Sequence, residues 1–277
     1  MSTTISKTTI SDDNYSFLQR YVYDQSGIVL DTGKQYLLEA RLSPILRERK
    51  VTDINSLCAL LRAATDLSLR KTVLEAMTTN ETFFFRDASP FEALKKHIIP
   101  ELIQSKSGSQ TINVWSAAAS TGQEIYSIAM LLLEAGLQNW NLGLFASDYS
   151  EQVLEKARAG RYLQIDVNRG LPAAYLVKYF NRVGVDWEVK AELRKRVHFE
   201  QLDLRNPTGK RVPFDIIFCR NVLIYFDVKT KQAVLNQIAR TTSDGAYLAL
   251  GAAETLLGIT CPFERVLVGQ SVFYKKR

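Results

Sequence analysis

From residue 111 onward, short apolar segments of strand type alternate with longer segments of helical spacing. Their order along the chain is INVW, IYSIAMLLLEAG, LGLFASD, EQVLEKARAG, VHFEQLDL, FDIIFCR, KQAVLNQIAR, AYLALGA and VFYKK. Such alternation is typical of α/β proteins, in which helices cover both faces of a mostly parallel sheet. Because ligands of these sheets bind at the carboxyl ends of the strands, we expect the functional site at that edge.

The other regions of the chain have different patterns. Residues 12–79 contain only helical spacing and predict a small all-helical domain, in which Pro44 kinks or restarts the second helix. Residues 80–277 form the sheet domain. At about residues 162–200 its alternation breaks, and period-two spacing around Gly184 predicts an inserted antiparallel β subdomain. The polar residues 1–11 predict a disordered tail.

Composition narrows the cellular setting and the partners. No apolar run reaches the roughly 18 to 20 residues that cross a bilayer, and the first residues lack a signal-peptide core, so we expect a cytoplasmic protein without membrane insertion. The cysteines and histidines are isolated from one another, which predicts neither disulfides nor a bound metal. The net charge of +6 indicates an acidic partner, which charge alone does not identify. We expect a monomer.

A run of small residues separates the first strand segment from its helix, in NVWSAAASTGQEIYSIAMLL. A loop without bulky side chains lets a ligand approach the exposed amides at a helix start. Residues 117–119 are alanines where a dinucleotide would require glycine, so the loop does not favour NAD. Asp148 ends the next strand, where such folds place a ribose-binding carboxylate. Helix capping, by Asp148 with Glu151 and by Thr121 with Glu124, explains these acids equally well.

Two further segments combine apolar runs with polar residues. In TTNETFFFRDASPF, three phenylalanines indicate packing, yet Arg86 lies among them and is suited to two-point binding of a carboxylate. In FDIIFCRNVLIYF, an apolar strand ends at Arg220 and Asn221, which we expect to face a ligand. Tyr225 follows, and packing accounts for it as well as function does.

Taken together, TTNETFFFRD, VWSAAASTGQEIYSIA, FASDYSEQVLEKARAGRY and FDIIFCRNVLIYFD, in this order, resemble the motifs of the chemotaxis receptor methyltransferases, the CheR family. The resemblance covers nearly the whole chain from about Asp12. It implies a class I S-adenosylmethionine-dependent methyltransferase, with a Rossmann-like sheet, an N-terminal helical domain and an inserted antiparallel subdomain. It also implies methyl transfer from S-adenosylmethionine to glutamates of chemoreceptors, which leaves S-adenosylhomocysteine as the product.

The same resemblance implies roles for individual residues. Glu124 would hold the amino group of the cofactor and Asp148 its ribose, while Asp203 and Leu204 would flank the adenine. Asp203 replaces the asparagine of many family members, and an aspartate could still accept a hydrogen bond from the adenine amine. The remaining cofactor-side residues would be Asn80, Thr82, Arg86, Ala117, Arg220 and Asn221, with Arg86 and Tyr225 as the catalytic pair. The segment GAAET, at residues 251–255, departs from the family pattern of glycine, serine and glutamate and receives no role.

The acceptor on this interpretation is an acidic helical bundle, for which the basic helical domain is a docking face, with Arg41, Arg47 and Arg49 as the expected contacts. Some family members also bind a C-terminal receptor peptide at the inserted hairpin. Here RVGVDWEV is short and has one glycine, which does not favour such a tether.

Three other functions compete with this one. A nucleic-acid methyltransferase would suit the basic charge, but the chain has no adjacent prolines for the motif of amino-group methylation, and Cys261-Pro262 reverses the order used against cytosine. A non-catalytic binding module would keep the fold and lack methyl transfer. A nucleotide-dependent oxidoreductase would need the missing glycine motif.

Overall fold

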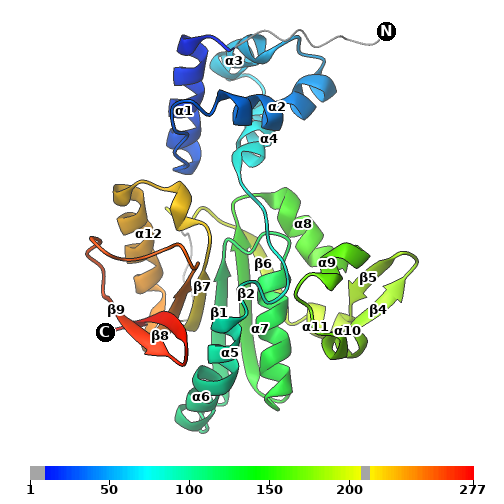
Figure 1. Cartoon of the computed structure of the whole chain (residues 1–277), viewed down its shortest axis with the longest axis vertical. Coiled ribbons are helices and arrows are strands. Elements are labelled where there is room, and N and C mark those ends of the chain that lie inside the picture. The colour runs from blue at the N-terminus through cyan, green and yellow to red at the C-terminus, as the bar shows by residue number, and fades with distance from the viewer. Residues whose placement is uncertain (1–9, 207–212) are drawn as a thin grey trace. The chain divides into compact units, whose positions relative to one another are not determined.

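The computed structural model describes residues 10–206 and 213–277 (Figure 1). Most of the predicted tail, residues 1–9, lies outside this range, and Ser11 caps the first helix, where its hydroxyl accepts a hydrogen bond from the Asn14 amide. The chain divides into two compact units. The N-terminal unit holds residues up to Thr79 together with Tyr225–Asp227, and the second unit holds Asn80–Ile224 and Val228–Arg277.

The N-terminal unit is all-helical. Its helices are α1 (Asp12–Ser26), α2 (Gln35–Arg49), α3 (Ile54–Ala63) and α4 (Leu67–Met77). Each helix buries one apolar stripe, and Leu18, Leu42, Leu57 and Val73 are fully buried at its centre. Helix α2 runs through Pro44 as one element, so the helix does not restart there.

The second unit is built on a seven-stranded sheet of order β6-β2-β1-β7-β8-β10-β9. The first five strands in this order are parallel, and β10 pairs antiparallel with both β8 and β9. The strands are β1 (Thr111–Ala117), β2 (Asn141–Asp148), β6 (Val197–Gln201), β7 (Phe214–Cys219), β8 (Thr242–Leu250), β9 (Phe263–Val268) and β10 (Ser271–Lys276).

Helices connect the parallel strands and cover the sheet. Helix α7 (Gln123–Glu134) packs against β1 and β2, and α8 (Glu151–Ala159) packs against β2 and β6 (Figure 1). Strand β7 leads through α12 (Val228–Arg240) to β8, and this step runs along the sheet in the direction opposite to the step from β1 to β2. Because parallel connections are right-handed, α12 covers the face of the sheet opposite to α7 and α8. The shorter α5 (Ser89–Ala93), a π-helical turn (Leu94–Ile98) and α6 (Ile99–Ser105) precede β1.

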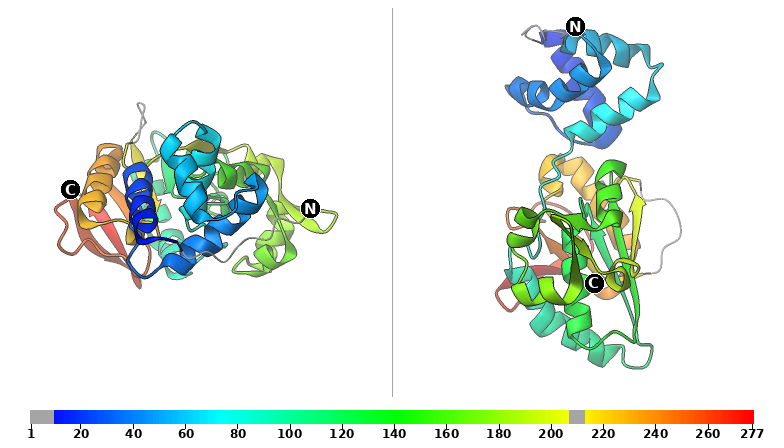
Figure 2. Two further views of the ribbon diagram at one scale, coloured as in Figure 1. Left: turned by 90° about the horizontal axis from the view of Figure 1, so that it is seen from above. Right: turned by 90° about the vertical axis from the view of Figure 1, so that its right-hand side faces the viewer.

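An insert follows α8. Its antiparallel sheet has the order β3-β5-β4, with β3 (Arg161–Tyr162), β4 (Phe180–Val183) and β5 (Asp186–Val189). The short helices α9 (Gln164–Asn168), α10 (Ala173–Tyr179) and α11 (Ala191–Arg194) complete it. The β4–β5 hairpin projects from one side of the second unit (Figure 2). Strand β6, which falls within the predicted limits of the insert, pairs with β2 in the main sheet.

One glycine joins the insert to the segment before α5. Gly170 has a φ of +84°, and a Cβ there would lie 2.0 Å from the carbonyl oxygen of Phe84. Only glycine allows this approach. No helix of the described residues is long and apolar enough to span a bilayer.

Candidate active site

The carboxyl ends of three strands meet at one edge of the main sheet. Strand β1 lies between β2 and β7, and Ala117 at its end pairs with Ser147 on one side and Cys219 on the other. The segments that follow these strands therefore converge. They carry the small-residue loop after β1, Asp148 at the end of β2 and Arg220 directly after β7.

The small-residue loop has a strained backbone. Ala118 and Ser120 have positive φ values of 65° and 50°, which is uncommon for residues other than glycine. The Ser120 amide donates to Asp148 Oδ2 at 2.8 Å, and Tyr162 of the insert donates its hydroxyl proton to the Thr121 carbonyl at 2.7 Å. Burial raises the pKa of Tyr162, so this hydroxyl remains a donor. The loop is thus held from two sides.

Asp148 is nearly buried, with 7% of its surface exposed. Its Oδ1 accepts from the Ser150 amide at 3.0 Å and its Oδ2 from Ser120. The alternative prediction, a capping box with Glu151, is wrong, because the N-cap of α8 is Ser150 and no side chain makes a capping hydrogen bond there. Asp148 instead orients the loop between β1 and α7.

Glu124 lies in the first turn of α7 and points into the protein. Its Oε1 accepts from the Ser116 hydroxyl at 2.7 Å, and its Oε2 accepts from Arg220 Nη1 at 2.9 Å. The second capping alternative, Thr121 with Glu124, is also wrong, since α7 has no side-chain cap. The ion pair with Arg220 forms between residues far apart in the sequence.

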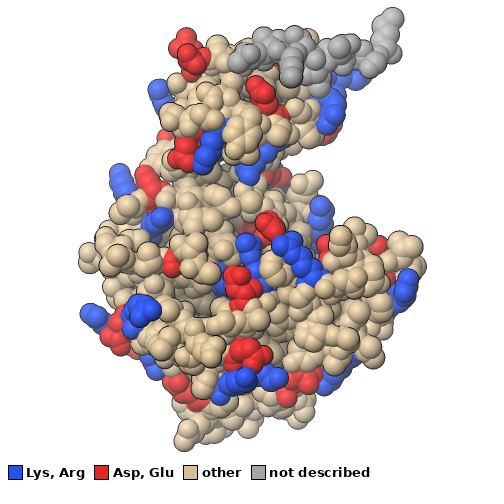
Figure 3. Space-filling model, viewed as in Figure 1, with Lys and Arg blue, Asp and Glu red and all other residues tan. Residues whose placement is uncertain are grey.

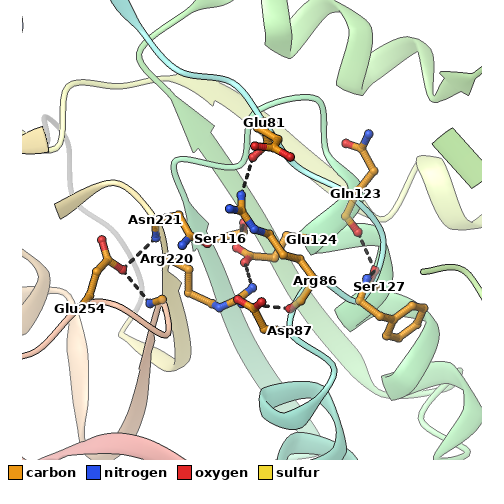
Figure 4. A network of polar contacts seen from close by, with 12 residues as sticks. Glu81, Arg86, Asp87, Ser116, Gln123, Glu124, Ser127, Arg220, Asn221 and Glu254 are labelled. Carbon is orange, nitrogen blue, oxygen red and sulfur yellow. Dashed lines mark hydrogen bonds and ion pairs between the residues drawn. The ribbon is translucent and has the colours of Figure 1, made fainter. Parts of the chain in front are cut away.

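Arg220 is the centre of a buried network (Figure 4). Its side chain is 1% exposed, and its Nη2 donates to Asp87 Oδ2 at 2.7 Å and to the Arg86 carbonyl at 2.9 Å. A buried guanidinium must be paired, and Glu124 and Asp87 supply the two opposite charges. Its Nε is buried and has no hydrogen-bond partner among the residues that the structure describes, so one donor is left for an anionic ligand group.

The segment with three phenylalanines serves both packing and the site. Phe84 is fully buried and packs edge-on against Tyr162 and Phe180 of the insert. The packing interpretation is correct for this residue. Phe85 and Asp87 instead have positive φ values of 52° and 58°, which adds strain beside Arg86.

Arg86 is half-buried and shares an aromatic ring with a second arginine. Its Nη1 donates to the Glu81 carbonyl at 2.6 Å, and its Cζ lies 5.7 Å from the centre of the Phe83 ring. The Cζ of Arg169 lies 4.1 Å from the same ring, and its Nη2 donates to Glu81 Oε1 at 2.8 Å. The Arg169 hydrogen bond, with the charges of both arginines, lowers the pKa of Glu81. Glu81 therefore stays ionised and offsets the charge of one of the two arginines.

The other predicted residues occupy varied positions. Asn80 is exposed and its carbonyl accepts from the Ser120 hydroxyl at 2.9 Å, while Thr82 is half-buried. Leu204 is buried, and Asp203 binds the Arg205 guanidinium with both carboxylate oxygens. Tyr225 is half-buried and belongs to the N-terminal unit. Its role at the site stays a prediction.

Glu254 lies in the segment that received no role from the sequence, and its carboxylate binds four backbone amides. Its carboxylate accepts hydrogen bonds from the amides of Gly251, Asn221, Val222 and Ile224. The family's recurrent glutamate in GAAET was the available signal. Three of its partners, the amides of Asn221, Val222 and Ile224, precede Glu254 by about thirty residues. Local sequence spacing therefore does not predict these contacts.

The residues at this edge fit an adenosyl sulfonium. Glu124 uses two of the roughly four acceptor positions of a carboxylate, which leaves capacity for an ammonium group. The unpartnered Nε of Arg220 suits a carboxylate. Ala117 has a side chain of one carbon, and the loop after it presents its backbone to a ligand.

Comparison with known families covers almost the whole chain. Residues 80–270 match the CheR methyltransferase, SAM binding domain, and residues 13–78 match the CheR methyltransferase, all-alpha domain. The chemotaxis protein methyltransferase of Vibrio parahaemolyticus is 40% identical over 96% of this chain and 98% of its own length. Chemotaxis protein methyltransferase 1 of Pseudomonas aeruginosa is 36% identical over 95% and 98%.

Among solved structures, magnesium protoporphyrin IX methyltransferase from Synechocystis PCC 6803 with bound SAM is 13% identical, with a TM-score of 0.37, over 78% of this chain and 93% of that one. The matches to the two family domains together account for the helical unit, the sheet and the cofactor. The chain belongs to the CheR methyltransferase family, with an S-adenosylmethionine-binding domain of class I fold that follows an all-α domain.

Proposed function

We propose that this chemotaxis protein methyltransferase transfers a methyl group from S-adenosylmethionine to glutamate side chains of chemoreceptors and forms glutamyl methyl esters. The acceptor carboxyl, with an ordinary pKa of about 4.3, is an anion at neutral pH, so it attacks without a general base. S-adenosylmethionine, when bound, supplies an electrophilic methyl group on a positively charged sulfur. The task of the protein is to align the acceptor and to exclude water.

The single observation that carries this proposal is the placement of Arg86. Its guanidinium has five N–H donors, and the described structure commits Nη1 to the Glu81 carbonyl. The backbone carbonyl of Arg86 accepts from Arg220 Nη2 at 2.9 Å, so this half-buried side chain begins beside the buried network at the edge of the sheet. In our proposal Arg86 orients the substrate carboxylate, and the Tyr225 hydroxyl donates a second hydrogen bond to it.

The cofactor is held in this proposal by the buried edge of the sheet. Glu124 accepts from its amino group and Asp148 from its ribose hydroxyls, while Arg220 donates to its carboxylate. The side chains of Asp203 and Leu204 border the adenine. The other contacts come from Asn80, Thr82, Ala117 and Asn221, with Arg86 between the cofactor and the acceptor.

The test separates methyl transfer from cofactor binding. The protein is incubated with labelled S-adenosylmethionine and a panel of receptor cytoplasmic fragments, and base-labile esters are mapped to individual glutamates. We expect Arg86→Ala to lower kcat/KM for the fragment about 100-fold, as loss of an orienting contact would, and to change the Kd of S-adenosylhomocysteine less than about threefold. Arg265→Ala, on the exposed surface of β9, is the matched control.

Two results would contradict this proposal. If the wild-type protein labels no glutamate in any fragment while it binds S-adenosylhomocysteine, it is a binding module. If Arg86→Ala weakens binding and transfer equally, Arg86 is a cofactor ligand and does not orient the acceptor.

Helix α2 of the N-terminal unit, which carries Arg41, Arg47 and Arg49, is our proposed docking face for the acidic receptor. Arg41 donates to the carbonyl of Met77 and, at 2.6 Å, to the hydroxyl of Thr79, while Arg49 donates to Asp66 and Ser68. These two arginines therefore also hold the helical unit together. Arg47 is exposed and is the better probe of docking. We do not propose that the insert recognises a receptor C-terminal peptide.

A further inference from the structure

The segment between β8 and β9 contributes one carboxylate to the loop that follows β7. Glu254 Oε2 accepts from the amides of Gly251 at 2.6 Å and Asn221 at 2.8 Å. Its Oε1 accepts from the amides of Val222 at 3.0 Å and Ile224 at 3.2 Å. Four backbone donors thus converge on one side chain, and Figure 4 shows the Glu254 carboxylate beside Asn221.

Three of these amides belong to the loop that begins at Arg220 and leads into the short 3-10 helix Leu223–Tyr225. Asn221 in this loop has a φ of +58°, in the left-handed region that asparagine adopts more often than most residues with a Cβ but still uncommonly. Charge-assisted hydrogen bonds to a carboxylate are stronger than neutral ones. Glu254 therefore stabilises a loop conformation that the backbone alone would not favour.

The approach between the two segments is tight. A Cβ on Gly251 would lie 2.7 Å from Asn221 Nδ2, 2.8 Å from Glu254 Oε2 and 2.9 Å from the Asn221 amide nitrogen. The close approach needs glycine at position 251, and the hydrogen bonds need the carboxylate of Glu254. Together they fix where the loop after β7 begins.

We propose that Glu254 is a positioning residue for methyl transfer. It acts through the loop 221–225, which carries Asn221 of the cofactor site and Tyr225 of the acceptor side. A carboxylate is required because each of its two oxygens accepts two N–H donors. A glutamine would offer one oxygen and turn an NH2 group toward the other amides. The expected change in kcat rests on the proposed function. The expected change in the Kd of S-adenosylhomocysteine rests on cofactor binding alone.

The experiment compares Glu254→Gln with Glu264→Gln, an exposed glutamate of β9. We expect Glu254→Gln to raise the Kd of S-adenosylhomocysteine, measured by calorimetry, about 10-fold, and to lower kcat for a receptor fragment about 10- to 100-fold, since a displacement on the order of 1 Å has such an effect. KM for the fragment should change less than about twofold, because in our proposal helix α2 docks the receptor and this loop contributes only the Tyr225 hydroxyl to it. Glu264→Gln should leave all three values at the wild-type level.

A second variant guards against loss of folding. Gly251→Ala keeps the Glu254 carboxylate and displaces the same loop, so it should lower kcat and cofactor affinity in the same direction. A folded Glu254→Gln with wild-type kcat and Kd would overturn the inference, and so would a folded Gly251→Ala with wild-type values if Glu254→Gln does not fold. If the wild-type protein methylates no receptor fragment, the proposed function fails, while the change in Kd still decides the role of Glu254.

Discussion

At the scale of single residues, the site depends on charges that are buried in pairs. Arg220 is almost fully enclosed and binds Glu124 and Asp87, whereas Asp148 binds backbone amides. Removing one partner of a buried pair leaves the other charge unpaired and desolvated, which is more harmful than removing both. The charged residues at this edge of the sheet therefore stabilise the protein only when all of them are present.

A double-mutant cycle on Arg220 and Glu124 measures this dependence. We expect Arg220→Met alone to lower the free energy of unfolding by about 3 to 5 kcal/mol, because Glu124 then remains buried without its cation. The pair Arg220→Met with Glu124→Leu should lose less than the sum of the two single variants. Urea unfolding gives each value, and additive losses would show that the two side chains do not interact.

Sequence predicted the strand-end positions of the candidate site residues better than it predicted their contacts. The strand-end positions of Asp148 and Arg220 follow from local patterns, and the structure places both at the predicted edge. The pairing of Glu124 with Arg220 has no local signal, since tertiary packing brings the two together. Both capping alternatives were locally reasonable and failed for the same reason, because the acids have stronger partners in the folded chain.

At the scale of elements, the insert is joined to the site segment through Gly170. Its positive φ and its approach to the Phe84 carbonyl exclude any side chain. Gly184, in the β4–β5 turn, has a φ of +63° and no heavy atom within 4 Å of the position that a Cβ would take, so it offers a matched comparison. The two glycines separate the effect of backbone conformation from that of close contact.

We expect Gly184→Ala to lower the free energy of unfolding by about 1 to 2 kcal/mol through its φ alone. Gly170→Ala should lose about 2 to 5 kcal/mol, because overpacking against Phe84 adds to the same conformational term. Thermal and urea denaturation measure both. Equal losses in the two variants would mean that the contact with Phe84 relaxes freely.

The helices and strands of this fold differ in how well the sequence predicts them. The regular helices and the parallel strands have strong periodicity, and the predicted fold class is confirmed. The short helices of the insert and strand β9 were not predicted, because four to seven residues carry too little periodicity. Strand β6 belongs to the alternating segment VHFEQLDL and also falls in the predicted limits of the insert, and its pairing with β2 assigns it to the main sheet.

At the scale of the whole molecule, 35 Lys and Arg residues exceed 29 Asp and Glu residues. On the face shown in Figure 3, Lys and Arg side chains are interspersed with Asp and Glu. The net charge of +6 therefore acts mainly by attracting an acidic partner from a distance, and local residues decide where it docks.

Reversing one exposed charge on α2 tests the docking face. We expect Arg47→Glu to lower kcat/KM for receptor fragments roughly fivefold at low ionic strength, which corresponds to about 1 kcal/mol, and the loss should shrink at high salt. Arg20→Glu, exposed on α1, makes the same change of net charge on another helix. Equal effects of the two variants would indicate general attraction without a docking site on α2.

The order of strands in the main sheet has a consequence for synthesis of the protein. Strand β1 lies beside β7, yet residues 118–213 leave the ribosome between them. At about 5 to 20 residues per second, a nascent chain waits roughly 5 to 20 s for β7 after β1 has been made. During that interval β1 has β2 on one side and no strand on the other, so the edge at which we propose that the cofactor binds is completed only after β7 has been made.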